Sequence, residues 1–543
     1  MLLPLPSGPV AALLTAAAAT TAAATVALRT DLLSPFPPPP LSGAAGRRCI
    51  GVVDARLPAS VSPARLRVRL FYPAVSPTRG VGRWVPRRRA SWLPPSFGRP
   101  WEPHTTAAGI VAFIKGPSVA GLLLSSFAAL RLRALAAPPL AGRASPTRDD
   151  ADAERRQDGI RTAAYGAAPA GSAGGNGAAA LASVSASLGD ARLPLILFSH
   201  GLAGSVCGYT STCTALAAAG DGALVVAVEH ADGSAFCTQV TGPDGQPVTI
   251  PYTTFADAAS ARGLTDERAF REAQVDQRVA ELTAAVAGVA AWAAGEEAVE
   301  PLGRGGGVDL AGRVDASRVA VVGHSFGAAT AFTYSHVARR AAAAATGRGK
   351  DGTPAPTVYS CVMHDAWMYA VPNKLLQDGV AVPTLFITAE RSSMPQSLAA
   401  QQTLLGVDAA RVKRGSGDGS GGASPPTVDG SPAVAWVELV GALHNNQSDF
   451  PVVLPRWVAT RAGMTAPDID AAAVAGANSA VTAAWVTDAW GRAGRSGRQA
   501  GVSAAVAALP DPAAVRVVAN PGEDRSAGAR ATGRTASRLG KRG

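Results

Sequence analysis

Cysteine and aromatic residues are scarce in this chain of 543 residues, which has five cysteines and 5% aromatic side chains. An odd and widely spaced set of cysteines does not form a disulfide framework, and no pair has the Cys-x-x-Cys spacing of a structural zinc site. Signatures of helix-turn-helix, zinc-finger and RNA-binding proteins are missing as well. The sequence therefore predicts no metal, no other cofactor and no nucleic-acid partner.

The N-terminal region lacks charge. Residues 10–28 form an Ala-rich run that no basic residue precedes, whereas a secretory signal begins with a basic region. Ala and Thr are also too weakly apolar for a membrane-spanning helix, and an organelle transit peptide would carry Arg. We favour a cleaved segment for secretion or for an organelle over a cytoplasmic protein, and we assign residues 1–45 to a targeting or disordered segment.

Positive charge is concentrated at the other end of the chain. Residues 492–543 hold ten Lys and Arg against three acidic residues, and so supply +7 of the net charge of +11. We predict that residues 491–543 form a disordered basic tail. The alternative is a tail attracted to an anionic membrane surface, where each basic residue contributes roughly 1 kcal/mol.

Between these ends we expect one catalytic domain, residues 46–490, interrupted by low-complexity inserts. The inserts are rich in Gly, Ala, Ser, Pro or charge, and they are predicted to be disordered loops. They cover residues 143–190, 295–313, 341–356 and 414–432.

Hydrophobic periodicity indicates the fold class. Residues 65–70 alternate between Arg and apolar residues, which is typical of a half-buried strand, and residues 266–294 repeat apolar residues at helical spacing. Short apolar runs have the character of buried strands in a parallel sheet; they are residues 195–198, 223–228, 319–322, 358–363, 384–388 and 435–440. Strands that alternate with helices predict a doubly wound α/β fold, with a mostly parallel central sheet and helices on both faces.

A nucleophile motif lies at residues 323–327, where the sequence Gly-His-Ser-Phe-Gly fits the G-x-S-x-G pattern. An apolar strand precedes it and a run of small residues starts a helix after it. That is the strand–turn–helix setting of the nucleophile elbow in the α/β-hydrolase fold. Gly323 and Gly327 allow the sharp turn and the close approach of strand and helix, so we predict that Ser325 is the nucleophile.

A serine hydroxyl needs a base, and the base needs an acid to orient it. In this fold the acid and then the histidine follow the serine along the chain, which leaves His336, His364 and His444 as candidates. His444 follows the last apolar strand, where the fold places its base, and we predict that it is the base. Asp365 and Glu390 both lie at the carboxyl ends of predicted strands, and their spacing does not separate them.

Two backbone N–H groups should form the oxyanion hole of such an enzyme. One belongs to the residue after the nucleophile, Phe326. The other should come from a loop after an earlier strand, and Leu202 follows the strand at 195–198 in the sequence Ser-His-Gly-Leu. We predict that these two residues supply the donors.

Several blocks of sequence, taken together, resemble the platelet-activating-factor acetylhydrolases of the plasma and intracellular type II kind. They are Phe-Tyr-Pro at 71–73, Trp-Val-Pro at 84–86, Pro-Leu-Ile-Leu-Phe-Ser-His-Gly-Leu at 194–202, residues 228–235, residues 274–279, Gly-His-Ser-Phe-Gly-Ala-Ala-Thr at 323–330, Asp-Ala-Trp-Met at 365–368 and residues 444–450. The resemblance extends from about residue 49 to residue 456. It is interrupted by the inserts, one of which makes the interval between Ser325 and Asp365 longer than in the family.

The resemblance implies a calcium-independent esterase of the phospholipase A2 type. Such an enzyme removes acetyl or other short, often oxidised, acyl groups from the sn-2 position of phospholipids such as 1-alkyl-2-acetylglycerophosphocholine. It also implies that Asp365, and not Glu390, is the acid. Residues 119–130 are mostly apolar and precede Arg131 and Arg133; they are a candidate interfacial helix for peripheral contact with a lipid surface, with a core-packed helix as the alternative.

Two other functions stay open from the sequence. One is a general carboxylester or polyester hydrolase with the same fold. The other, from a different class, is a non-catalytic lipid-binding relative, against which the intact set of Ser325, Asp365 and His444 argues.

Overall fold

The computed structural model describes twelve stretches of the chain. They are residues 49–74, 89–91, 131–136, 192–220, 222–297, 299–302, 308–344, 356–392, 394–404, 434–491, 502–509 and 511–519. The predicted N-terminal segment, the inserts at 143–190 and 414–432 and the candidate interfacial helix at 119–130 lie outside the described residues.

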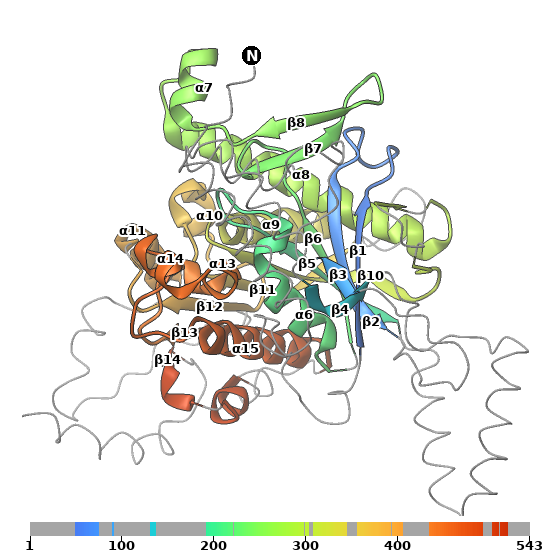
Figure 1. The fold of residues 1–543 in the computed structure, drawn as a ribbon. Helices are drawn as coiled ribbons and strands as arrows, with labels where there is room; N and C mark the ends of the chain where they lie inside the picture. Colours follow the sequence, from blue (N-terminus) through green and yellow to red (C-terminus); the bar gives the residue numbers. More distant parts are fainter. Residues whose placement is uncertain are drawn as a thin grey trace, which may run out of the picture.

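A 12-stranded sheet forms the centre of the molecule (Figure 1). Eleven strands follow one another in the order β14 (Val515–Ala519), β13 (Val434–Leu439), β12 (Thr384–Ala389), β11 (Thr357–His364), β10 (Val314–His324), β5 (Leu193–Ser199), β6 (Leu224–Val228), β2 (Arg67–Ala74), β1 (Cys49–Arg56), β4 (Arg131–Ala136) and β3 (Arg89–Ser91). The short strand β9 (Glu300–Pro301) pairs with β1. The run from β6 to β13 is parallel, whereas β2 is antiparallel to both β1 and β6. This strand order confirms the predicted α/β-hydrolase fold.

Helices cover both faces of the sheet, as Figure 1 shows. Four of these helices are α6 (Thr210–Ala218), α8 (Glu267–Ala294), α9 (Phe326–Ala344) and α15 (Ala471–Gly491). Leu195 and Leu197 of β5 belong to a core that includes residues of α8 and α9, while Ile196 and Phe198 belong to a second core with residues of α6 and α15. Because successive side chains of a strand point to opposite faces, a strand covered on both sides is apolar at every position.

Smaller elements lie between and after these helices and strands. They are η4 (Val206–Tyr209), the hairpin of β7 (Cys237–Thr241) and β8 (Pro247–Pro251), α7 (Phe255–Arg262), η5 (Met368–Ala370), α10 (Asn373–Gln377), α11 (Pro395–Leu404), η6 (His444–Gln447), α13 (Phe450–Val453), α14 (Arg456–Arg461) and η7 (Pro512–Ala514). The hairpin and α7 lie together at one end of the molecule in Figure 1. Within the described residues, no helix combines the length and apolar character needed to cross a bilayer.

The prediction that β2 is half-buried is wrong. All eight of its residues are buried, and Arg67 and Arg69 are 3% and 0% exposed. Strands β1 and β6 pair with its two edges, and its two faces are covered, since Leu70 belongs to one core and Phe71 to the other. The Arg69 guanidinium donates from Nε and Nη2 to the Asp54 carboxylate, at 2.7 and 2.9 Å, on the adjacent strand. A buried cation needs such a partner, and the alternation of residue types did not reveal it.

Parts of the predicted disordered segments are ordered, which corrects those predictions. In the insert at 295–313, β9 pairs with β1, and Val308 and Leu310 are buried. The last turn of α9 includes residues 341–344 of another predicted insert. In the basic tail, residues 502–507 are helical and β14 pairs with β13. Apolar residues of these pieces belong to the two cores: Val308 and Leu310 to one, and Val502 and Val515 to the other.

Candidate active site

Ser325 lies between β10 and α9 with a backbone φ of 57°. This left-handed conformation is strained for a residue with a side chain. Hydrogen bonds from the neighbouring strand end hold it there: the Ser325 N–H donates to the His364 carbonyl at 2.9 Å, and the Trp367 N–H donates to the Ser325 carbonyl at 3.1 Å. The predicted strand–turn–helix elbow is therefore present.

The two glycines of the motif allow contacts that no side chain would permit. A Cβ atom on Gly323 would lie 2.0 Å from the Gly327 carbonyl oxygen, and one on Gly327 would lie 2.1 Å from the Ser199 carbonyl oxygen. Real Cβ atoms do not approach backbone oxygens so closely. The turn and the packing of α9 against β5 therefore both require glycine.

His444 reaches Ser325 from the loop that follows β13. Its Nε2 lies 2.9 Å from Ser325 Oγ, and its Nδ1 lies 2.5 Å from Asp365 Oδ2. With the proton on Nδ1, the ring donates to the carboxylate and Nε2 can accept the serine proton. The His444 side chain is 31% exposed, whereas that of Asp365 is 4% exposed, so the chain of hydrogen bonds runs from the surface into the protein.

Asp365 follows β11 and also has a positive φ, 36°. Its N–H donates to the Ile387 carbonyl at 2.7 Å, and its Oδ1 accepts from the Ala389 N–H at 3.2 Å. Both partners belong to β12, which fixes the carboxylate beneath the imidazole. One oxygen is thus held by the backbone while the other contacts His444.

Glu390, the other candidate acid, is engaged elsewhere. Its carboxylate accepts from the Gly441 N–H at 2.7 Å and from Arg516 Nη2 at 3.0 Å. The hydrogen bond from Gly441 is the main cause that lowers the pKa of this carboxyl. The structure therefore brings Asp365, and not Glu390, to His444.

The side chains of the other two histidines after the motif have partners other than the Ser325 hydroxyl. His336 Nε2 donates to the Gly379 carbonyl at 3.0 Å. His364 Nε2 lies 2.8 Å from Thr482 Oγ1, and burial lowers the pKa of His364 to about 3. His336 thus joins α9 to the segment after α10, and His364 joins β11 to α15.

Leu202 and Phe326 lie at the two places expected for oxyanion donors. Leu202 is in the loop after β5, and Phe326 is the first residue of α9. The structure gives neither N–H an acceptor among the described residues. The first N–H groups of a helix have no partner within it, which favours an anion at this position.

Tyr209 and His324 link the two loops that flank Ser325, and the sequence had not identified this connection. The Gly201 N–H donates to Tyr209 Oη at 3.0 Å, Tyr209 Oη lies 2.9 Å from His324 Nδ1, and His324 Nε2 lies 3.1 Å from the His444 carbonyl. A carbonyl only accepts, so Nε2 carries the proton and Nδ1 accepts from the tyrosine. Burial, which lowers the pKa of His324 well below its ordinary value, is consistent with a neutral ring.

Metal ligands do not gather at this site or elsewhere in the described parts of the chain. No group of three or more His, Cys, Asp and Glu side chains there could hold an ion. Ordered polar contacts around Ser325 come instead from backbone groups and from the His444 and Asp365 side chains.

Comparison with known proteins gives one family and several relatives. The family model described as "Platelet-activating factor acetylhydrolase, isoform II" matches residues 178–486. A chicken (Gallus gallus) platelet-activating factor acetylhydrolase is 31% identical over 208 residues, which cover 37% of this chain and 44% of the relative. A putative phospholipase A2 of Schizosaccharomyces pombe is 27% identical over 289 residues, 50% of this chain and 62% of the relative. The chain thus aligns with less than two thirds of either relative's length.

Among solved structures, a ferulic acid esterase from Streptomyces cinnamoneus aligns with 82% of this chain and 91% of its own. The sequence identity is 18% and the TM-score is 0.41. An overlap this loose has no bearing on the chemistry of the site.

Proposed function

Since this chain belongs to the platelet-activating factor acetylhydrolase isoform II family, we propose that it is a serine esterase acting on phospholipids. It would remove acetyl and other short or oxidised acyl groups from the sn-2 position, without calcium. The observation that carries the proposal is the continuous chain of hydrogen bonds from Ser325 Oγ through His444 to Asp365. A purely lipid-binding protein has no use for that arrangement at a strained elbow.

In the proposed reaction, Ser325 Oγ attacks the acyl carbonyl while His444 Nε2 takes its proton. Asp365 keeps the imidazole oriented and stabilises its protonated form. The N–H groups of Leu202 and Phe326 stabilise the negative charge on the carbonyl oxygen. His444 then gives its proton to the departing lyso-phospholipid, and a water molecule releases the acyl group from Ser325 by the same steps in reverse.

Peripheral contact with a lipid surface is part of the proposal. Trp457 in α14 is 72% exposed, and this helix follows the loop that carries His444. Arg456 and Arg461 lie in the same helix. An exposed tryptophan beside basic residues suits the interface between acyl chains and anionic headgroups.

The test is release of acetate from 1-alkyl-2-acetyl-glycerophosphocholine by the full chain in the presence of EDTA. We expect turnover without calcium, a preference for the acetyl lipid over one with a long sn-2 chain, and loss of turnover in Ser325→Ala. Hydrolysis of p-nitrophenyl acetate without hydrolysis of either phospholipid would assign a general carboxylester hydrolase instead. Failure of a fluorophosphonate probe to label Ser325 would contradict a serine esterase of any kind.

A further inference from the structure

A buried arginine of α8, Arg278, lies beneath the loop that carries Leu202. The residue is 0% exposed, and its Nε donates to Asp232 Oδ2 at 2.9 Å. The Asp232 side chain is also 0% exposed. Apolar residues in place of a buried ion pair are often equally stable or more so, so stability alone does not account for this pair.

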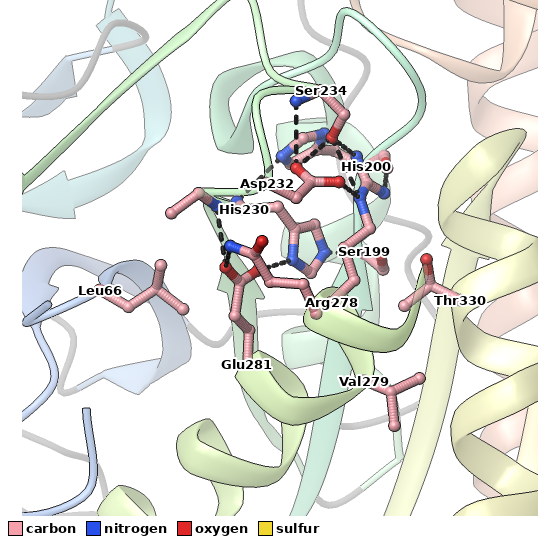
Figure 2. Close-up of polar contacts among 12 residues, drawn as sticks. Leu66, Ser199, His200, His230, Asp232, Ser234, Arg278, Val279, Glu281 and Thr330 are labelled. Atoms are coloured by element: carbon pink, nitrogen blue, oxygen red, sulfur yellow. Dashed lines mark hydrogen bonds and ion pairs between the residues drawn. The ribbon is translucent and has the colours of Figure 1, made fainter. Parts of the chain in front are cut away.

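The first contact of Arg278 is with the loop after β5. Its Nη1 donates to the His200 carbonyl at 2.7 Å, and its Nη2 donates to Ser234 Oγ at 2.5 Å. The Ser234 carbonyl in turn accepts from the Ala203 N–H at 2.7 Å. Figure 2 shows Arg278, Asp232, Ser234 and His200 drawn together in this network. The loop is thereby held on both sides of the peptide that contains the Leu202 N–H.

The direction of the Leu202 N–H is set by the carbonyl of the same peptide. The Gly201 carbonyl accepts from the Gly204 N–H at 3.0 Å and from His200 Nδ1 at 2.8 Å. Because a peptide is planar and trans, its N–H points opposite to its carbonyl. His200 Nε2 accepts from the His230 N–H at 3.2 Å, which leaves Nδ1 as the protonated nitrogen. The hydrogen bonds to the Gly201 carbonyl therefore fix the orientation of the Leu202 N–H, and Arg278 fixes its position.

The second contact of Arg278 is with the nucleophile elbow. The central carbon of its guanidinium lies 4.5 Å from the centroid of the Phe326 ring, within the range of a cation–π contact. The Phe326 residue is 0% exposed, and its N–H is the other proposed oxyanion donor. One side chain thus touches the residue that carries one donor and the loop that carries the other.

We propose that Arg278 is a positioning residue that sets the separation of the Leu202 and Phe326 N–H groups. This inference rests on the proposed esterase function. The role uses the flat guanidinium in three ways at once: one edge binds the His200 carbonyl, another binds Asp232, and the face packs on Phe326. A lysine has one compact ammonium group and no flat face, so it cannot make the three contacts together.

The oxyanion forms only during the reaction, so a displaced donor lowers turnover more than it weakens substrate binding. For Arg278→Lys acting on p-nitrophenyl acetate we expect kcat to fall about 100-fold, the size of effect seen when one oxyanion donor is lost. We expect KM to change by less than about threefold, since ground-state binding does not use these donors. A protein that is merely less stable would lose active sites, which also lowers the apparent kcat at constant KM, so kcat is calculated per active site counted by fluorophosphonate titration.

A second readout uses a short-chain trifluoromethyl ketone, which adds to the nucleophilic serine and places an oxyanion between the same donors. Its Ki should rise in Arg278→Lys by the factor by which kcat/KM falls. Titration with a fluorophosphonate counts the competent sites, and circular dichroism checks the fold. Arg268→Lys is the matched control: Arg268 lies on the same helix, 34% exposed, paired with Glu272, and we expect its kcat and ketone Ki to equal those of the wild type.

Phe326→Leu keeps the backbone N–H but removes the ring, and it tests the same idea if Arg278→Lys does not fold. We expect kcat and ketone affinity to fall together by about tenfold or less, the range of one cation–π contact. Unchanged kcat and Ki in the folded variants, or a rise in KM alone, would overturn the role of Arg278. A wild-type chain that hydrolyses neither ester nor phospholipid would overturn the proposed function as well, so the two failures are distinguishable.

Discussion

Two hydrogen-bonded sets of serine, histidine and carboxylate lie close together in this protein, and only one of them is suited to catalysis. We call the set of Ser325, His444 and Asp365 the exposed chain, and the set of Ser199, His230 and Glu281 the buried chain. Ser325, His444 and Asp365 are joined by contacts of 2.9 and 2.5 Å. The second chain joins Ser199 Oγ to His230 Nε2 at 2.8 Å, and His230 Nδ1 to Glu281 Oε2 at 2.7 Å. Figure 2 shows this second chain beneath the loop after β5. The interatomic distances are nearly the same in the two chains.

The difference lies in the backbone and in access. Ser325 has a positive φ and is 8% exposed, and its histidine side chain is 31% exposed. Ser199 is the last residue of β5, and both it and His230 are 0% exposed. Burial lowers the pKa of His230 well below its ordinary value, so the ring cannot readily take a proton. Hydrogen-bond distances alone therefore do not identify a nucleophile; a strained, accessible turn with free N–H donors does.

The largest effect is expected when the nucleophile of the exposed chain is removed. Ser325→Ala should lower kcat by about 10⁶-fold, because removal of the nucleophile leaves only binding and the oxyanion donors. The measurement is p-nitrophenyl acetate hydrolysis at saturating substrate, with the fold checked by circular dichroism. Retention of more than a small fraction of wild-type turnover would show that the nucleophile is another residue.

The next largest effect is expected when the acid of the exposed chain is replaced. Asp365→Asn should lower kcat by about 10⁴-fold at neutral pH, since an amide favours the wrong tautomer of the histidine. Glu390→Gln is the control, because Glu390 contacts Gly441 and Arg516 and not His444; its turnover should stay near that of the wild type. Equal losses in the two variants would contradict the assignment of Asp365.

Gly327 lies between the two chains. It follows Ser325 in the elbow, and a Cβ atom there would lie 2.1 Å from the Ser199 carbonyl oxygen. Gly327→Ala should lower the free energy of unfolding by about 3 kcal/mol or more, since backbone must move to relieve the overlap. Gly476→Ala is the matched control in α15, where a Cβ would meet nothing within 4 Å; it should stabilise the protein by about 0.5–1 kcal/mol. Urea denaturation measures both, and a stable Gly327→Ala would show that α9 can separate from β5.

The buried chain should appear in the pH dependence of stability. Burial raises the pKa of Glu281 to about 7, from 4.5. The folded state then keeps a proton that the unfolded state releases, so Glu281 costs stability as pH rises from about 4.5 to about 7. Glu281→Gln removes this cost, and its free energy of unfolding relative to wild type should increase between pH 5 and pH 8 by up to about 3 kcal/mol. Urea denaturation across that range would contradict the idea if the difference between the two proteins stayed constant.

The smallest effect is expected for the serine of the buried chain. Ser199→Ala removes one buried hydrogen bond, to His230, and should lower the free energy of unfolding by about 1 kcal/mol. Its kcat should remain close to that of the wild type, measured under the conditions used for Ser325→Ala. A loss of turnover comparable to that of Ser325→Ala would remove the distinction between the two chains.

The sequence predicted the fold and most of the site, because their signals are local. The apolar runs at 195–198 and 319–322 identified β5 and β10, and Gly323 and Gly327 identified the elbow between β10 and α9. The choice between Asp365 and Glu390 depended on the family resemblance. In the structure position decides it: Asp365 contacts His444, whereas Glu390 contacts Gly441 and Arg516 of the C-terminal region. No local pattern predicts a contact between residues 126 positions apart.

The errors have the same origin. Arg69 was expected to face solvent, but Asp54 on the adjacent strand neutralises it inside the sheet. The insert at 295–313 and the basic tail were expected to be disordered, but β9 pairs with β1 and β14 pairs with β13. Composition describes how a segment behaves alone, whereas pairing with an existing strand satisfies its backbone groups.

By itself the sequence determined the alternation of strands and helices, the glycine-dependent turn at Ser325 and the order of serine, acid and histidine along the chain. Each of these follows from side-chain size, polarity and spacing within a few residues. Only the tertiary structure decided which carboxylate meets His444, which serine is accessible, and that Arg278 contacts both the loop of Leu202 and the ring of Phe326. Those outcomes depend on burial and on partners far apart in the chain, which exist only once the sheet and its helices have packed together.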